Sequence, residues 1–79
     1  MKNTVRPLYE IAIDITANWA KVNYGAVPYL DAMKTLDKIT DMYFQDTARS
    51  VVSYFLCNAT AWRGEVARDV KKELNAMLK

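Results

Sequence analysis

The chain of 79 residues is long enough for one domain and no more. Its content of 52% hydrophobic and 25% charged residues is ordinary for a globular protein and excludes an intrinsically disordered one. A net charge of +2 is too balanced to indicate nucleic-acid or membrane binding from composition.

The first predicted helix spans residues 7–22. It begins at Pro7, because proline is tolerated in a first helical turn and disfavours helix at the residue before it. One face carries apolar side chains at spacings of three and four residues: Leu8, Ile11, Ala12, Ile15, Trp19 and Val22. A second apolar stripe consists of Tyr9, Ile13, Ala20 and Tyr24. Such a helix either lies at the centre of the fold and packs on both sides, or presents the second stripe to a partner.

The second predicted helix spans residues 28–42. Gly25 suits the C-terminal cap of the first helix, where a left-handed backbone is common, and Pro28 suits the first turn of the second. The inner face carries Tyr29, Ala32, Leu36, Ile39 and Tyr43. The opposite face carries Asp31, Lys34 and Lys38, which indicate contact with solvent.

The third predicted helix spans residues 46–58 and follows a short connection at residues 43–45. Asp46 is the predicted N-cap. The buried face carries Ala48, Val51, Val52, Phe55 and Ala59. Cys57 lies on the opposite face near the helix C-terminus, where we expect an unreactive thiol. It is the single cysteine, which excludes an internal disulfide and favours a reducing compartment.

The fourth predicted helix spans residues 61–78. Its inner stripe carries Trp62, Val66, Val70, Leu74, Met77 and Leu78. Its outer face holds an acidic strip beside a basic one, namely Glu65, Asp69 and Glu73 beside Arg68, Lys72 and Lys79. Because charges of opposite sign can pair across the two strips at helical spacing, this face is interpreted as solvated, with docking to a partner as the alternative.

The joint between the third and fourth helices, NATAWRGE at residues 58–65, has the least regular pattern. Thr60 is the predicted N-cap of the fourth helix. Gly64 falls in the first turn. Glycine destabilises a helix by about 1 kcal/mol relative to Ala, and this cost would be tolerated if another backbone passes close by. Arg63 projects toward the apolar side of that helix. We expect it either to act as a strut that reaches a helix end or Asp14, or to contact a partner.

No segment shows the polar–apolar alternation of a half-buried strand. The sequence therefore predicts one all-α domain, residues 1–79, built as a compact bundle of four short helices, with three helices plus a kinked pair as the variant. The N-terminus does not resemble a signal peptide, and the longest apolar run is far short of the ~20 residues that cross a membrane. We therefore expect a cytoplasmic protein that does not bind membranes.

Histidine, the commonest general base and metal ligand, is missing from the sequence. With no histidine and one cysteine, it cannot form a Ser-His-Asp triad, a Cys-His pair or a thiolate metal centre. Acidic residues recur at helical spacing in Glu10 with Asp14 and in Asp37 with Asp41, but on predicted polar faces rather than inside the bundle. We expect no enzymatic activity, no cofactor and no metal.

The positive signal is an excess of aromatic residues, with five Tyr and two Trp. Tyr, Trp and Arg are enriched at interface hot spots, which favours binding to a protein. The predicted partner-binding residues are Tyr9, Ile13, Tyr24, Arg63, Arg68 and Lys72. Self-association through the stripe on the first helix stays open.

The alternative function is a small DNA- or RNA-binding regulator of helix-turn-helix type. Its turn would lie at residues 23–27, and the second predicted helix would be the recognition helix. Asp31 and Asp37 on that helix would repel phosphate, and phosphate contacts supply much of the affinity of such proteins.

Two segments, PYLDAM (28–33) and SVVSYFLCNATAWRGEVARDVKKELNAML (50–78), resemble short helical proteins of bacteriophages, prophages and integrative elements. That resemblance implies a bacterial cytoplasm and carries no assigned activity or residue roles. Because small phage proteins often bind a host protein, it implies a host or defence protein as the partner, and inhibitors of CRISPR effectors are one such class.

Overall fold

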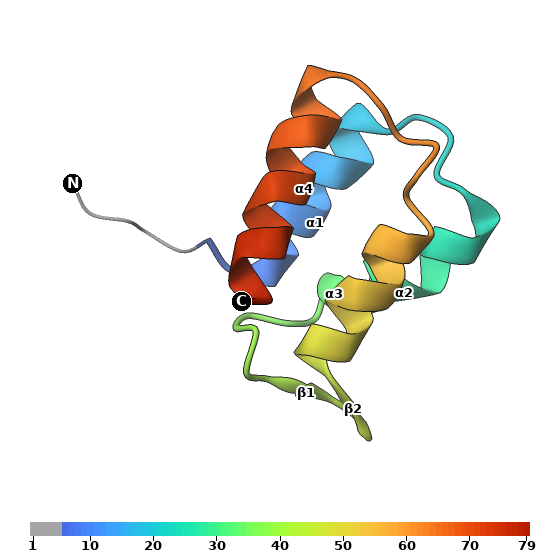
Figure 1. Ribbon diagram of the computed structural model, residues 1–79. Coiled ribbons are helices and arrows are strands. Elements are labelled where there is room, and N and C mark those ends of the chain that lie inside the picture. The colour runs from blue at the N-terminus through green and yellow to red at the C-terminus, as the bar shows by residue number, and fades with distance from the viewer. Residues whose placement is uncertain (1–5) are drawn as a thin grey trace.

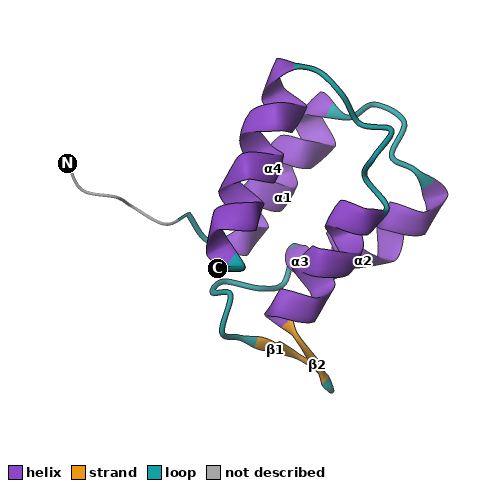
Figure 2. Ribbon diagram, in the orientation of Figure 1, coloured by secondary structure: helices purple, strands orange, loops and turns teal. Residues whose placement is uncertain are grey.

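Within residues 6–79, which the computed structural model describes, the chain forms four α-helices, one 3₁₀-helix and a two-stranded hairpin (Figure 1). The elements are α1 (Leu8–Asn18), η1 (Tyr24–Ala26), α2 (Val27–Met33), β1 (Met42–Tyr43), β2 (Asp46–Thr47), α3 (Ala48–Cys57) and α4 (Glu65–Met77). Figure 2 shows that helix dominates and that the strands lie at one end of the molecule. The predicted helical bundle is confirmed in this coarse form, whereas the prediction of a fold without strands is wrong.

The helices are arranged as two pairs around a common core. α1 and α4 lie side by side and run antiparallel, while α2 packs against both α1 and α3 (Figure 1). The side chains predicted for the inner faces of the first and third helices are buried, except the partly buried Val22. Fully burying a large apolar side chain contributes about 1.5–3 kcal/mol, so this core supplies most of the stabilisation. It comprises Leu8, Ile11, Ala12, Ile15, Trp19, Ala26, Leu30, Ala32, Met33, Leu36, Ala48, Val51, Val52, Phe55, Ala59, Trp62, Ala67, Val70 and Leu74.

Three aromatic rings join the end of α1, the end of α3 and the joint before α4. Trp19 stacks on Trp62 with ring centroids 5.5 Å apart and 11° between the planes, and it meets the edge of Phe55 at 6.2 Å. Such pairs add about 0.5–1.5 kcal/mol beyond the area they bury. The extended backbone of Trp19, with φ −121° and ψ 92°, accompanies this packing. α1 therefore ends at Asn18, and the predicted end at residue 22 is wrong.

Gly25 is not the C-terminal cap of α1 but lies within η1. A Cβ at this position would meet Oδ1 of Asn58 at 2.6 Å, and Nδ2 of Asn23 donates a hydrogen bond to the carbonyl of Asn58 at 2.9 Å. η1 therefore passes close to the end of α3. A side chain at position 25 would therefore require the Asn58 side chain to shift, and no left-handed backbone is involved.

α2 ends at Met33, nine residues before the predicted end at residue 42. The segment after α2 serves the N-terminus of α1, which has no side-chain cap. The free N–H groups of Leu8 and Tyr9 donate instead to the carbonyls of Asp37 and Leu36, both at 2.8 Å. Past Met33 the N–H groups of Thr35 and Leu36 donate to the carbonyls three residues back, those of Ala32 and Met33, so the α-helical ladder of α2 has already ended before Leu36.

The segment that follows forms the hairpin, which the helical interpretation of residues 28–42 missed. Met42 pairs with Thr47 and Tyr43 with Asp46 in antiparallel register. Phe44 opens the turn between the strands with a φ of 56°, an uncommon conformation for an aromatic residue. The N-cap of α3 is Thr47 rather than Asp46, because the Thr47 hydroxyl accepts a hydrogen bond from the backbone of Ser50 at 3.1 Å.

α4 begins at Glu65 rather than at residue 61, and its N-cap is Gly64 rather than Thr60. Gly64 has φ 116° and ψ −178°, a region that glycine alone adopts readily, and this backbone turns the chain from the joint into the helix. The later start changes the inner face. Ala67 is buried, while Val66, which we predicted to be buried, is 42% exposed.

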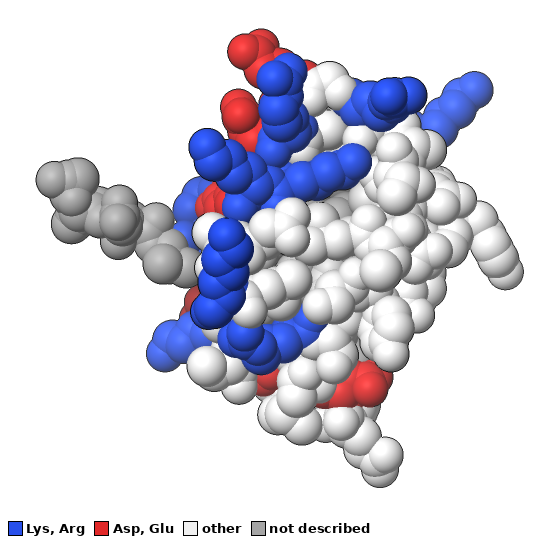
Figure 3. All heavy atoms as spheres, viewed as in Figure 1, with Lys and Arg blue, Asp and Glu red and all other residues white. Residues whose placement is uncertain are grey.

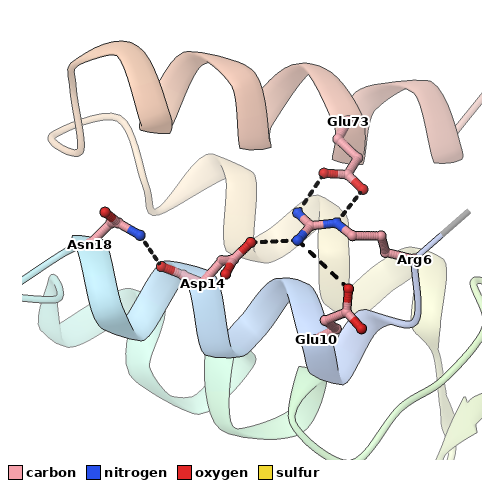
Figure 4. A network of polar contacts seen from close by, with 5 residues as sticks. All are labelled: Arg6, Glu10, Asp14, Asn18 and Glu73. Atoms are coloured by element: carbon pink, nitrogen blue, oxygen red, sulfur yellow. Dashed lines mark hydrogen bonds and ion pairs between the residues drawn. The ribbon is translucent and has the colours of Figure 1, made fainter.

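Arg6 fastens the start of the described chain to both α1 and α4 (Figure 4). Its Nε and Nη2 donate to the two carboxylate oxygens of Glu73 at 3.0 and 2.8 Å, and its Nη1 donates to Asp14. Glu10 lies further away, with 3.9 Å between its Oε1 and the Nη1 of Arg6. Hydrogen bonds to Glu73 and then Asp14 raise the pKa of Arg6 above its ordinary value. The guanidinium therefore stays charged, and it links the two helices by a bidentate pair.

Candidate partner-binding surfaces

The basic face of α4, defined as Arg63, Arg68 and Lys72, is the first candidate site. Arg68 and Lys72 lie one turn apart on the helix, and Arg63 immediately precedes its N-cap. All three side chains are exposed. In Figure 3, Lys and Arg side chains gather on the side of the visible surface that α4 occupies. The structure therefore places three of the predicted partner-binding residues on one side of the molecule.

An open hollow of about 280 Å³ lies beside this face, where the joint meets the first turns of α4. Its lining includes the basic side chains of Arg63, Arg68 and Lys71. The remaining lining residues are Thr60, Trp62, Gly64 and Ala67. A concave surface with three cations around it fits a carboxylate or another anionic group of a partner.

Arg63 is not the strut proposed from its helical projection, because the helix begins after it and the side chain points to solvent. Asp14, its suggested partner, is bound by Arg6. The strut is Lys71, whose Nζ donates to the carbonyl of Trp62 at 2.6 Å. Sequence reasoning missed Lys71, and its position three residues after Arg68 and next to Lys72 was the usable signal. The interpretation of Arg63 as a contact residue stays a prediction.

The three cations of the basic face differ from Arg6 and Arg49 in their contacts with the described part of the chain. Within residues 6–79, no ion pair or side-chain hydrogen bond involves Arg63, Arg68 or Lys72. By contrast, Arg6 binds two carboxylates, and Arg49 donates to the carbonyl of Leu78. The charges of the basic face are therefore available to a partner without breaking an internal contact.

The three apolar residues of the predicted interface are exposed: Tyr9 by 45%, Ile13 by 61% and Tyr24 by 91%. The interpretation that α1 packs on both sides and buries them is therefore wrong. Tyr9 and Ile13 lie one turn apart on the outer side of α1. Tyr24 lies in η1, beyond the connection that leaves the other end of α1 (Figure 1). The structure thus gives an exposed pair on α1 and a separate exposed tyrosine rather than one stripe.

A second concave surface, the tyrosine groove, lies between α2, the hairpin and α3. It has a volume of about 560 Å³ and is lined by Pro28, Tyr29, Ala32, Tyr43, Asp46, Val51 and Tyr54. The sequence interpretation missed it, because Tyr29 and Tyr43 were assigned to the inner face of one long helix. The usable signal was the run Tyr43-Phe44 followed by Thr47, since aromatic and β-branched residues on both sides of a short turn favour a hairpin.

The acidic pairs noted in the sequence contact an arginine in one case and backbone N–H groups in the other. Glu10 and Asp14 face Arg6. The carboxylate of Asp41 accepts hydrogen bonds from the backbone N–H groups of Lys38 and Asp37 at 3.0 and 3.2 Å, and these bonds lower its pKa. Within residues 6–79, no group of three or more His, Cys, Asp or Glu side chains is placed to hold a metal ion. Cys57 is a free, exposed thiol.

Comparison of the chain with protein-family models, with curated proteins and with solved structures finds no match. None of the helices within residues 6–79 has the length and apolar character needed to cross a membrane.

Proposed function

We propose that this chain is a non-enzymatic helical protein that binds a partner protein through the basic face of α4. The observation that carries the proposal is the exposure of Arg63, Arg68 and Lys72 beside an open hollow, without internal partners among the described residues. Side chains of this kind attract and orient an acidic surface, and arginine adds bidentate pairing with carboxylates. The absence of histidine from the sequence motivates the non-enzymatic part.

The surroundings of the basic face favour a protein over a nucleic acid. Glu65 and Asp69 lie on the neighbouring strip of α4, and both are exposed. A phosphate backbone is uniformly negative and would be repelled by these carboxylates, whereas a protein surface can offer both signs of charge. The expectation that the partner is a host or defence protein, such as a CRISPR effector, rests on the sequence resemblance and stays a prediction.

Nucleic-acid binding is the second candidate, and the same exposed cations favour it. The surface differs from the one that the helix-turn-helix interpretation named. α2 has only seven residues, and its Asp31 already pairs with Lys34 at 3.6 Å. A nucleic acid would therefore contact α4. Three phosphate contacts would give a slope of about −3 for the logarithm of affinity against the logarithm of salt concentration.

The test compares two triple variants with the same change in net charge. Arg63→Glu, Arg68→Glu and Lys72→Glu reverse the basic face, while the control reverses three exposed lysines elsewhere, namely Lys21, Lys34 and Lys38. Each chain is immobilised and exposed to bacterial lysate, and the captured proteins are then measured for affinity as purified components. We expect the basic-face variant to lose at least about tenfold in affinity for its partner, while the control retains it.

Two results would contradict the proposal. Equal loss of affinity in both triple variants would show that net charge, rather than the basic face, controls binding. Tight binding of duplex DNA or RNA that the basic-face variant abolishes, together with no protein that binds after purification, would select the nucleic-acid alternative. Thermal melting of both variants by circular dichroism confirms that each chain is folded before its binding is compared.

A further inference from the structure

The tyrosine groove is separate from the basic face of α4, and it has the opposite electrostatic character. Asp46 is the single charged residue in its lining. Within residues 6–79, the Asp46 carboxylate takes part in no ion pair and no side-chain hydrogen bond. The groove therefore combines an unneutralised negative charge with a wall of aromatic rings.

The hairpin register brings the charge and one ring together. Tyr43 and Asp46 are directly opposite residues of β1 and β2, a pairing in which the two Cβ atoms lie about 5 Å apart on the same face of the hairpin. The two other tyrosines come from different helices. Tyr29 of α2 stacks on Tyr54 of α3 with ring centroids 5.4 Å apart and 27° between the planes. The site is thus built by three elements and depends on the fold rather than on one segment.

We propose that the tyrosine groove binds an arginine side chain of a partner protein. A guanidinium group is planar and weakly hydrated, it stacks on the faces of tyrosine rings, and its donors match a carboxylate. The rings of Tyr43 and of the Tyr29–Tyr54 pair supply the stacking surfaces, and Asp46 supplies the carboxylate. This assignment is independent of the role of the basic face, because it concerns other residues and the opposite charge.

The charge of Asp46 favours an arginine side chain over an apolar segment as the occupant of the groove. An apolar or proline-rich segment seated in the groove would cover the Asp46 carboxylate without providing a hydrogen-bond donor, and covering an unpaired charge is costly. A cationic side chain instead turns the same carboxylate into a charge-assisted hydrogen bond. The Asp46 carboxylate therefore makes the groove favour a cationic side chain over an apolar one.

The test uses the full chain labelled with ¹⁵N and the peptide acetyl-Gly-Arg-Gly-amide as probe. Its control is the same peptide with citrulline in place of arginine, which keeps the shape and removes the charge. We expect saturable shifts of amide signals in α2, the hairpin and the start of α3 with the arginine peptide at millimolar concentration. The citrulline peptide should bind at least about threefold more weakly, because it loses the cation–π contact and the ion pair.

Two substitutions assign the effect to the groove. Asp46→Asn and Tyr54→Leu should each weaken binding of the arginine peptide by about two- to fivefold. Asp69→Asn is the matched control, since Asp69 is an exposed aspartate of α4 without an ion pair among residues 6–79. The amide spectrum of each variant shows directly whether the chain remains folded.

Any of four outcomes would overturn the inference. They are absence of saturable shifts, equal binding of the citrulline peptide, an unchanged affinity in the Asp46→Asn variant, and shifts confined to residues outside the groove. A polyproline peptide that produces the same shifts at lower concentration would assign the groove to a proline-rich segment instead. Shifts that depend on protein concentration without peptide would assign it to a second copy of this chain.

Discussion

Replacing Gly64 by alanine should destabilise the fold through backbone strain alone. At φ 116° and ψ −178°, Gly64 occupies a region that costs an L-residue about 1–3 kcal/mol. A Cβ added there has no heavy atom within 4 Å, so no steric clash with another segment adds to the strain. Alanine recovers about 0.4–1 kcal/mol by restricting the unfolded chain. These ranges bracket a net loss in the free energy of unfolding of about 0–2.6 kcal/mol, with a midpoint of about 1.3 kcal/mol.

For a domain of this length, a loss of about 1 kcal/mol lowers the melting temperature by about 4–8 °C. At the midpoint of the range, Gly64→Ala should therefore lower Tm by about 5–10 °C in thermal unfolding followed by circular dichroism. The decisive control is D-alanine at position 64, introduced by chemical synthesis, because a D-residue accepts a positive φ. It should restore most of the loss. An L-alanine variant that melts as high as the D-alanine variant would refute the assignment of strain to this backbone.

Gly25 provides a comparison with a different physical cause. Gly25→Ala should also lower Tm, because its Cβ would approach the Oδ1 of Asn58 to 2.6 Å. D-alanine should give no rescue at position 25, whereas Asn58→Ala in the same chain should relieve the contact. The two glycines are therefore distinguishable by which second change restores stability.

Three further outcomes are expected. Arg6→Ala should lower the free energy of unfolding, measured by chemical denaturation, by about 1–2 kcal/mol, and this loss should shrink in about 1 M salt. Arg6→Lys should recover only part of the loss, because lysine lacks the bidentate fork of arginine. Backbone N–H groups lower the pKa of Asp41, so its contribution to stability is present above the ordinary value of 3.8 and is lost as the pH falls through the lowered pKa. Asp41→Asn should therefore melt at a lower temperature than the wild type at neutral pH, and this difference in Tm should disappear in acid. If the exposed pair Tyr9 and Ile13 supports self-association, the mass from sedimentation should rise with concentration and Ile13→Lys should abolish the rise; a constant wild-type mass contradicts it.

The inner faces of the first and third helices were predictable from the sequence, whereas that of the fourth was predicted only in part, because Val66 is exposed and Ala67 is buried. The periodicity of the third helix identified all the buried side chains of α3, namely Ala48, Val51, Val52 and Phe55. A single amphipathic segment contains the spacing that separates its buried face from its exposed face. Helix ends were not predictable in the same way. α2 ends at Met33, and the carbonyls of Leu36 and Asp37 just beyond it accept hydrogen bonds from the start of α1, about 28 residues earlier in the chain. Contacts of this kind do not appear in any local window of the sequence.

The same distinction holds for the candidate sites. Arg68 and Lys72 share a face because helical spacing alone brings them together, and this was visible in the sequence. The tyrosine groove was not, because Tyr29, Tyr43 and Tyr54 belong to three elements whose meeting depends on the hairpin. Tyr24 shows the converse error, since extending the period of α1 past its true end joined it to a surface that it does not share.

The stacked tryptophans give the molecule an optical signal for its own assembly. Trp19 and Trp62 are the two tryptophans of the chain, and they lie face to face where α1, α3 and the joint before α4 meet. Rings held in this geometry couple their electronic transitions, so the near-ultraviolet circular dichroism and the indole fluorescence should both depend on that contact. Docking of the α1–α4 pair onto α3 can therefore be followed without a label, separately from the helical signal that reports the individual helices.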